Sequence, residues 1–260
     1  MNPIRYHDDV EVPVENEAEI SQRIVERMAA TQAENADRHR HAHRDAHAKS
    51  HAILTGQLTV HDDLPHELAQ GIFATPGTHE VIARLSSAPG DIRSDEIPAP
   101  RGFALKIIDV EGERLSPDLG GANQDFLMVN FPTLAFGTVT KYEDMLDILE
   151  KNASNPAAAQ KAVSAAARGI ASITEKLGRT PGATVQGLAN DYSHMLGETF
   201  YTQAAIRYGD HVAKMSLAPT GEVAELTGVD VGDDFDAMRT AVVRHFMTKG
   251  ATYELRVQLC

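Results

Sequence analysis

Histidines gather in one short stretch of the chain, between His39 and His51. Five of them fall within these thirteen positions, and an apolar run follows directly. Because an imidazole titrates near neutral pH and also binds transition metals, such a stretch suits either acid–base chemistry or metal binding. Residue type alone leaves three roles open: a metal site, a catalytic base and a solvated helix end.

A metal site requires that the histidines share one face of a helix. His43, His47 and His51 are spaced four residues apart, which is the spacing of such a face, and two imidazoles placed in this way can chelate a metal ion. The stretch contains no cysteine and no carboxylate pattern that would complete the ligand set. We assign no metal ligand, and a histidine-rich helix end exposed to water stays the alternative.

Several short motifs occur in a fixed order from Arg44 onward. The stretch 44–50 reads RDAHAKS, and it is followed by ARLSS over residues 83–87, PRGFALK over 100–106 and DFLMVNFP over 125–132. In this order the motifs resemble those of the haem catalase superfamily. The divergent catalase-like peroxidases are closer than the full-length catalases, and the resemblance covers approximately residues 38 to 260.

The resemblance implies a haem b cofactor and roles for four residues. His47 matches the distal histidine that acts as acid and base on peroxide, and Ser86 matches the residue that orients this histidine by hydrogen bonding. Arg44 and Arg84 match positions that pair with the haem propionates, and a permanently charged guanidinium suits that task. No residue is assigned as the iron ligand.

The implied activity is that of a haem-dependent catalase or peroxidase, which decomposes or reduces hydrogen peroxide or organic hydroperoxides with a small-molecule electron donor. The family's distal asparagine falls on Ala122 in the ungapped alignment, with Asn123 one residue later. Without that amide, reduction by a donor is expected to gain importance over disproportionation. Two alternatives remain: a non-catalytic barrel that binds haem or another apolar ligand, and a lipid hydroperoxide isomerase.

The elements that position these residues follow from hydrophobic periodicity. Ile20, Ile24 and Met28 have the spacing of one helical face, and the helix is expected to continue or restart toward the histidines. Further helices are expected over residues 141–151, 156–178 and 233–250. Apolar, β-branched segments bounded by turns predict seven strands, over residues 52–60, 79–87, 101–109, 125–131, 200–208, 210–219 and 253–260.

Seven strands with inserted helices indicate an α+β fold. The resemblance specifies an antiparallel catalase-type β-barrel with seven of its eight strands present. We expect an N-terminal arm and helix over residues 1–37 and a barrel domain over residues 38–260. This barrel domain is expected to be C-terminally incomplete, because the family's proximal iron ligand, a tyrosine in an Arg-x-x-x-Tyr stretch, has no match before Cys260. The strand 253–260 would then form an edge of the sheet.

Composition narrows the class of protein further. The chain has 260 residues and a formal net charge of -13, so its field repels nucleic-acid phosphates and anionic lipid surfaces. No stretch of apolar residues is long enough for a membrane helix, and a single cysteine, Cys260, excludes an intrachain disulfide. We expect a cytoplasmic protein that binds neither nucleic acid nor membranes, and the family suggests a homo-oligomer.

Overall fold

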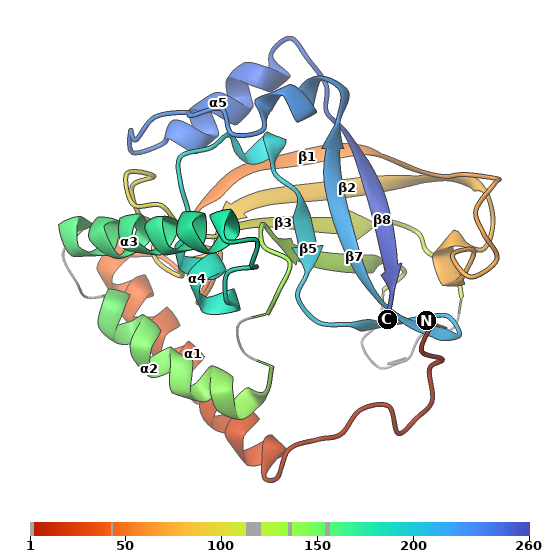
Figure 1. Cartoon of the computed structure of the whole chain (residues 1–260), viewed down its shortest axis with the longest axis horizontal. Helices are drawn as coiled ribbons and strands as arrows, with labels where there is room; N and C mark the ends of the chain where they lie inside the picture. Colours follow the sequence, from red (N-terminus) through yellow and green to blue (C-terminus); the bar gives the residue numbers. More distant parts are fainter. Residues whose placement is uncertain (1–2, 43, 113–120, 135–136, 154–156) are drawn as a thin grey trace.

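The computed structural model describes residues 3–42, 44–112, 121–134, 137–153 and 157–260. Its body is an antiparallel sheet of eight strands with helices packed around it (Figure 1), which confirms the expected α+β class. The strands are β1 (Ser50–Val60), β2 (Gly77–Ser87), β3 (Arg101–Ile107), β4 (Gln124–Val129), β5 (Phe200–Thr202), β6 (Ile206–Tyr208), β7 (His211–Thr220) and β8 (Thr252–Leu259).

The strands pair in the order β1, β2, β3, β4, β5, β7, and β7 also pairs with β6 and β8. Within the described chain β8 has β7 as its only strand partner, so it forms an edge of the sheet, as expected. The N-terminal segment lies against the same end of the sheet: the Ile4 N–H donates to the Cys260 carbonyl, and Val212 N–H donates to the Ile4 carbonyl. Ile4 near the start of the chain therefore lies beside Cys260 at its end.

The eighth strand arises from a break in a segment that was expected to be continuous. Residues 200–208 form two short strands, β5 and β6, which pair with different parts of β7. Between them Gln203 leaves the ladder, and its side-chain amide donates to the Phe131 and Tyr201 carbonyls. Seven sequence segments therefore give eight strands.

The interior of the curled sheet contains the hydrophobic core. Alternate residues are buried along most of β7 and from Phe103 onward in β3, which is the pattern of strands with one face on the core. The Phe103 ring on β3 lies 5.3 Å from the Phe200 ring on β5 and 5.6 Å from the Tyr253 ring on β8. Because these strands are not neighbours in the sheet order, their contact shows how strongly the sheet curls.

The described ranges contain five α-helices: α1 (Glu17–His39), α2 (Val139–Ala153), α3 (Ala157–Lys176), α4 (Ala183–Leu188) and α5 (Ala237–Phe246). Figure 1 shows α1 to α4 grouped at one side of the sheet and α5 at its upper end. Ile20 and Ile24 of α1 pack on Leu146 of α2 in a small second core, with an Arg23–Glu143 ion pair beside it. None of the helices in the described ranges is long and apolar enough to cross a membrane. A separate unit over residues 1–37 stays a prediction.

The first helix continues toward the histidines, as expected, and stops at the first of them. Helix α1 ends at His39, where Arg40 adopts a left-handed conformation with φ 62°. Tertiary contacts fix this end: Arg38 and His39 both bind the Asp91 carboxylate, and Asn35 donates to the Gly90 carbonyl. Residues 40–42 and 44–49 form neither helix nor strand, so His47 lies in a loop directly before β1.

Candidate active site

The backbone of His47 is held in an unusual conformation. Its φ is 52°, in the left-handed region that costs a non-glycine residue roughly 1–2 kcal/mol. Four hydrogen bonds hold the segment against β2 and the loop after it: His47 N–H to Ala88 O, Ala48 N–H to Pro89 O, Ser87 N–H to Lys49 O, and Arg84 Nη2 to His47 O at 2.6 Å. Strain that the surroundings enforce in this way is characteristic of functional sites.

The His47 ring lies between β2 and β3. Its Nδ1 is 3.0 Å from Ser86 Oγ, and Ser86 is almost completely buried. A Cβ atom built on Gly102, which pairs with Ser86 across the sheet, would stand 2.5 Å from His47 Cε1. The ring therefore lies directly on a strand that has no side chain at this position. Nε2 has no hydrogen-bond partner among the described residues.

The electrostatic environment keeps this imidazole neutral. Burial, reinforced by the nearby guanidinium groups of Arg84 and Arg44, lowers the pKa of His47 below its ordinary 6.5. When Nδ1–H donates to Ser86 Oγ, Nε2 keeps its lone pair and can accept a proton. Burial also lowers the pKa of Arg84, and the charge of Arg44 adds to this effect, so two cationic side chains lie close together beside His47. The structure thus brings all four predicted residues into one region.

Prediction from sequence missed an apolar row on the same face of the sheet. Ile53, Arg84, Ala104 and Leu127 stand side by side on β1, β2, β3 and β4 in the strand register. Ile53 is 70% exposed and Leu127 is 72% exposed, whereas their sequence neighbours on the other face point into the core. Only the pairing register, which sequence does not give, places these two side chains on either side of Arg84. An exposed apolar row of this kind is a candidate binding surface.

The metal-site alternative gains no support from the structure. His47 and His51 do not lie on a helix, and His43 is outside the described residues. The Nε2 atom of His51 is 2.8 Å from Ser87 Oγ, and burial lowers the pKa of His51 to about 4. His51 is therefore a neutral core histidine, and no cluster of metal ligands occurs in the described ranges.

The side-chain amide expected near the distal site is that of Asn123, and the structure describes its position in the chain. Asn123 lies directly before β4, and the Ala122 carbonyl accepts a hydrogen bond from the Val110 N–H at 2.6 Å. Ala122 itself is exposed. A role for Asn123 in positioning peroxide stays a prediction.

Gly102 offers a direct test of the arrangement around His47. In Gly102→Ala the new methyl group would meet His47 Cε1 and Nδ1 at 2.5 and 2.6 Å, so the ring must leave its buried place. Because burial lowers the pKa of this imidazole, we expect its pKa to rise toward the ordinary 6.5. An NMR titration of the histidine ring signals measures this change. Gly56→Ala on β1 is the control, since its Cβ would stand 3.7 Å from Val81; an unchanged His47 pKa in Gly102→Ala would contradict the placement.

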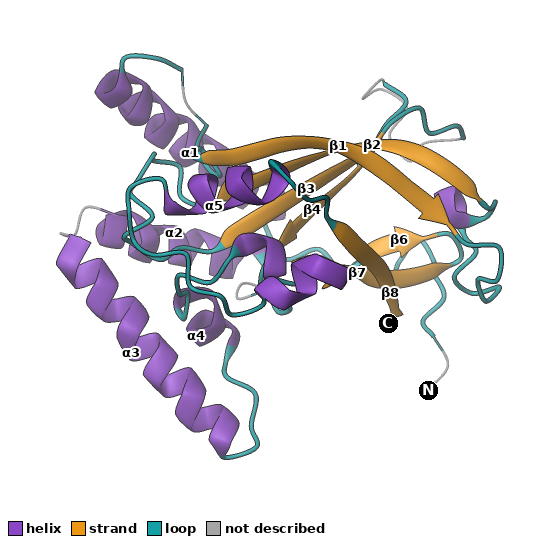
Figure 2. Cartoon of the chain, turned by 90° about the horizontal axis from the view of Figure 1, so that it is seen from above, coloured by secondary structure: helices purple, strands orange, loops and turns teal. Residues whose placement is uncertain are grey.

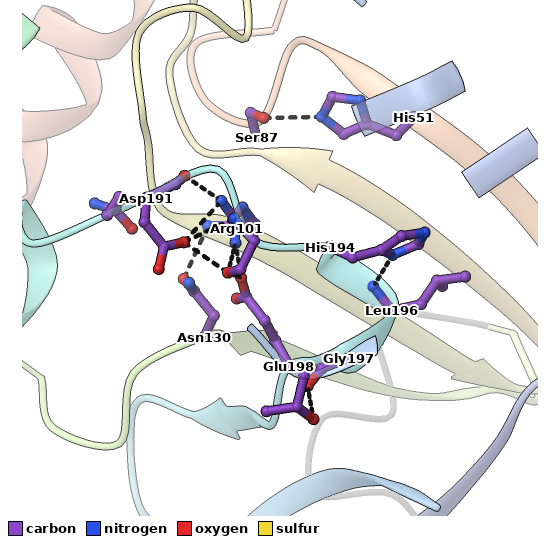
Figure 3. Close-up of polar contacts among 12 residues, drawn as sticks. His51, Ser87, Arg101, Asn130, Asp191, His194, Leu196, Gly197 and Glu198 are labelled. Carbon is purple, nitrogen blue, oxygen red and sulfur yellow. Dashed lines mark hydrogen bonds and ion pairs between the residues drawn. The ribbon is translucent and has the colours of Figure 1, made fainter. Parts of the chain in front are cut away.

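A second polar cluster lies on the opposite face of β3. Arg101, the residue before Gly102, is 2% exposed, and its guanidinium bonds to Glu198, to Ser193 Oγ at 3.0 Å and to the Asp191 carbonyl (Figure 3). Successive residues of a strand point to opposite faces, so this cluster is separate from His47. It fastens β3 to residues 191–198 beside a cleft of about 590 Å³.

Comparisons with known proteins support the fold and nothing finer. No family model matches the chain, and no curated protein matches it. Among solved structures, a fungal catalase is 15% identical with a TM-score of 0.53, covering 100% of this chain and 50% of the catalase chain. A bacterial catalase is 17% identical with a TM-score of 0.52, covering 98% and 47%. The chain thus has a catalase-like fold and spans about half the length of the catalases it matches.

Proposed function

We propose that this protein is a haem-dependent catalase-like peroxidase that acts on hydrogen peroxide or an organic hydroperoxide. The observation that carries the proposal is the arrangement of His47: its ring lies on Gly102, its Nδ1 is bonded to Ser86, and its Nε2 is free to meet a ligand. The catalase-like fold adds to this argument, although at 15 to 17% identity it supports fold alone.

The residues around His47 fit one face of a haem. Arg44 and Arg84 supply two positive charges, which suit the propionate groups. Ile53 and Leu127 supply an exposed apolar row for the porphyrin plane, and Ala104 between them is small.

The part of the reaction that falls to this chain is proton transfer. When bound, haem supplies an iron that polarises the peroxide and takes up its oxidising equivalents. His47 Nε2 accepts a proton from the bound peroxide oxygen and returns it to the departing oxygen, which leaves as water or alcohol. Ser86 keeps the ring in the tautomer that has its lone pair at Nε2. The electrons would come from a small-molecule donor, or from a second peroxide molecule in a catalase reaction.

Haem binding can be tested separately from turnover. We expect the purified chain to bind about one haem, seen as a Soret band in an absorbance titration, and to oxidise a donor dye with peroxide. In the double variant Arg44→Gln/Arg84→Gln the lost charge pairs should weaken haem binding at least tenfold, since a charge-assisted bond contributes about 1.5–3 kcal/mol. The double variant Arg179→Gln/Arg239→Gln, at exposed positions, is the control and should bind as the wild type does.

The results also separate the alternatives. Haem binding without turnover above that of free haem would favour a non-catalytic haem-binding barrel. Conversion of a lipid hydroperoxide without any donor would favour an isomerase. Absence of haem binding in a folded protein would overturn the proposal for this chain.

A further inference from the structure

Helix α3 buries polar side chains and exposes apolar ones. Its inner face contains the polar Gln160 and Ser164, which are 7% and 6% exposed, and the small Ala167 at 6%. Its outer face has four large apolar side chains that are 40 to 72% exposed, at Val163, Ile170, Ile173 and Leu177. A surface helix ordinarily has the reverse arrangement. Figure 2 shows α3 at the outside of the molecule, extending away from the sheet, and the exposed fractions of these side chains leave the outer face open to a partner.

The outer face has the spacing of a coiled-coil seam. Its residues recur at alternating intervals of four and three positions, the heptad pattern that keeps one stripe facing a second helix. Leu177 continues the stripe because its N–H still donates to the Ile173 carbonyl. We call this stripe the α3 seam: Ala159, Val163, Ala166, Ile170, Ile173 and Leu177, all of them exposed.

We propose that the α3 seam joins two copies of this chain in an antiparallel pair. The side chains of the seam are small in its first half and large in its second half. Only an antiparallel partner therefore places a larger side chain opposite each smaller one. With the usual antiparallel layers the pairs across the interface are Ala159 with Leu177, Val163 with Ile173, and Ala166 with Ile170. A parallel pair would put alanine on alanine and leave cavities.

The positions that flank the seam also permit a second copy. Among Ala162, Gly169, Thr174 and Lys176 only one is charged, so two copies meet without strong repulsion, and the small Ala162 and Gly169 allow close approach. Helix α3 is already ordered before a second copy binds. Gln160 accepts a hydrogen bond from Arg93 and Arg168 donates one to the Asn190 carbonyl, and these two bonds hold α3 to the body of the protein.

A membrane surface is the rival occupant, since a basic amphipathic helix can lie on anionic lipid. Two of the cations of α3 are already engaged within the protein, Lys161 with Glu96 and Arg168 with Asn190. The net charge of -13 further opposes binding to an anionic surface. The observations therefore favour a second copy over lipid.

The first experiment measures the mass of the full chain in solution. The seam spans about five helical turns, roughly 27 Å, which is a small interface. We therefore expect a dimer with a dissociation constant on the order of 10 µM, seen by sedimentation velocity between about 1 and 100 µM. Ile170→Asp or Ile173→Asp should be monomeric throughout, whereas Val243→Asp, at an exposed apolar position of α5, should dimerise normally.

Disulfide trapping then tests the direction of the pair in a Cys260→Ser background. In an antiparallel pair Val163→Cys should crosslink with Ile173→Cys when the two variants are mixed. Neither should crosslink with itself, because identical positions then lie about 15 Å apart along the axis, beyond disulfide reach. A wild type that stays monomeric at about 100 µM, self-crosslinking of each variant, or a monomer that binds anionic vesicles through Ile170 would each overturn the proposal.

Discussion

His47→Ala is expected to lower the rate of peroxide-dependent donor oxidation by about 10²–10⁴-fold, the usual contribution of a general acid–base group. Haem binding should survive, since Arg44, Arg84 and the apolar row on the sheet are unchanged. The loss should therefore fall on turnover per bound haem. Steady-state kinetics of the haem-loaded protein, normalised to the Soret absorbance, measure it.

The pH dependence of the same reaction gives a second readout. Because His47 must be neutral to accept a proton, activity should fall as the pH drops through its pKa. That pKa is lowered by burial, so the fall should occur below the ordinary 6.5 and be absent from His47→Ala. His66→Ala, which removes an exposed histidine, is the matched control and should behave as the wild type does. Equal turnover in His47→Ala and wild type would refute the assigned role.

The sheet could be predicted from the sequence because each strand has a local signature. Alternation of apolar residues located the strands around Arg84, Phe103 and Met215. The start of β5 at Phe200 and the end of β7 at Thr220 were also predicted to within one residue. The break between β5 and β6 was missed because it depends on Gln203 and its tertiary acceptor Phe131. The end of α1 was missed for a similar reason, since contacts with Asp91 rather than local propensity set it.

The candidate site was predictable only in part. Motif resemblance pointed to His47 and Ser86, whose contact spans 39 residues and has no local signature of its own. The same motifs contain Gly102, yet only the folded structure shows that its missing side chain makes room for the His47 ring. The shared row of Ile53 and Leu127 could not be predicted from the sequence, because it follows from the register of the paired strands.

The segment that leads from His47 into β1 is anchored by a buried lysine. Lys49 Nζ donates to Asp95 Oδ1 at 2.8 Å, to Arg93 O at 2.9 Å and to Phe235 O, and the two charged side chains are only 7% and 4% exposed. The other oxygen of Asp95 accepts the Met238 N–H at 2.9 Å at the start of α5. The Lys49–Asp95 ion pair thus joins the segment before β1, the loop after β2 and α5, three parts of the chain whose proximity no sequence pattern indicates.

Lys49→Met is therefore expected to lower the free energy of unfolding by about 3–5 kcal/mol, because it leaves the Asp95 carboxylate buried without its cation. Lys106→Met is the matched control: its ion pair with Asp125 is about half exposed, and its loss should cost at most about 1 kcal/mol. The double variant Lys49→Met/Asp95→Asn removes the buried charge and keeps an acceptor for the Met238 N–H, so it should recover part of the lost stability. Urea unfolding at neutral pH measures all three, and a loss in Lys49→Met no larger than that in Lys106→Met would show that the pair does not anchor the segment.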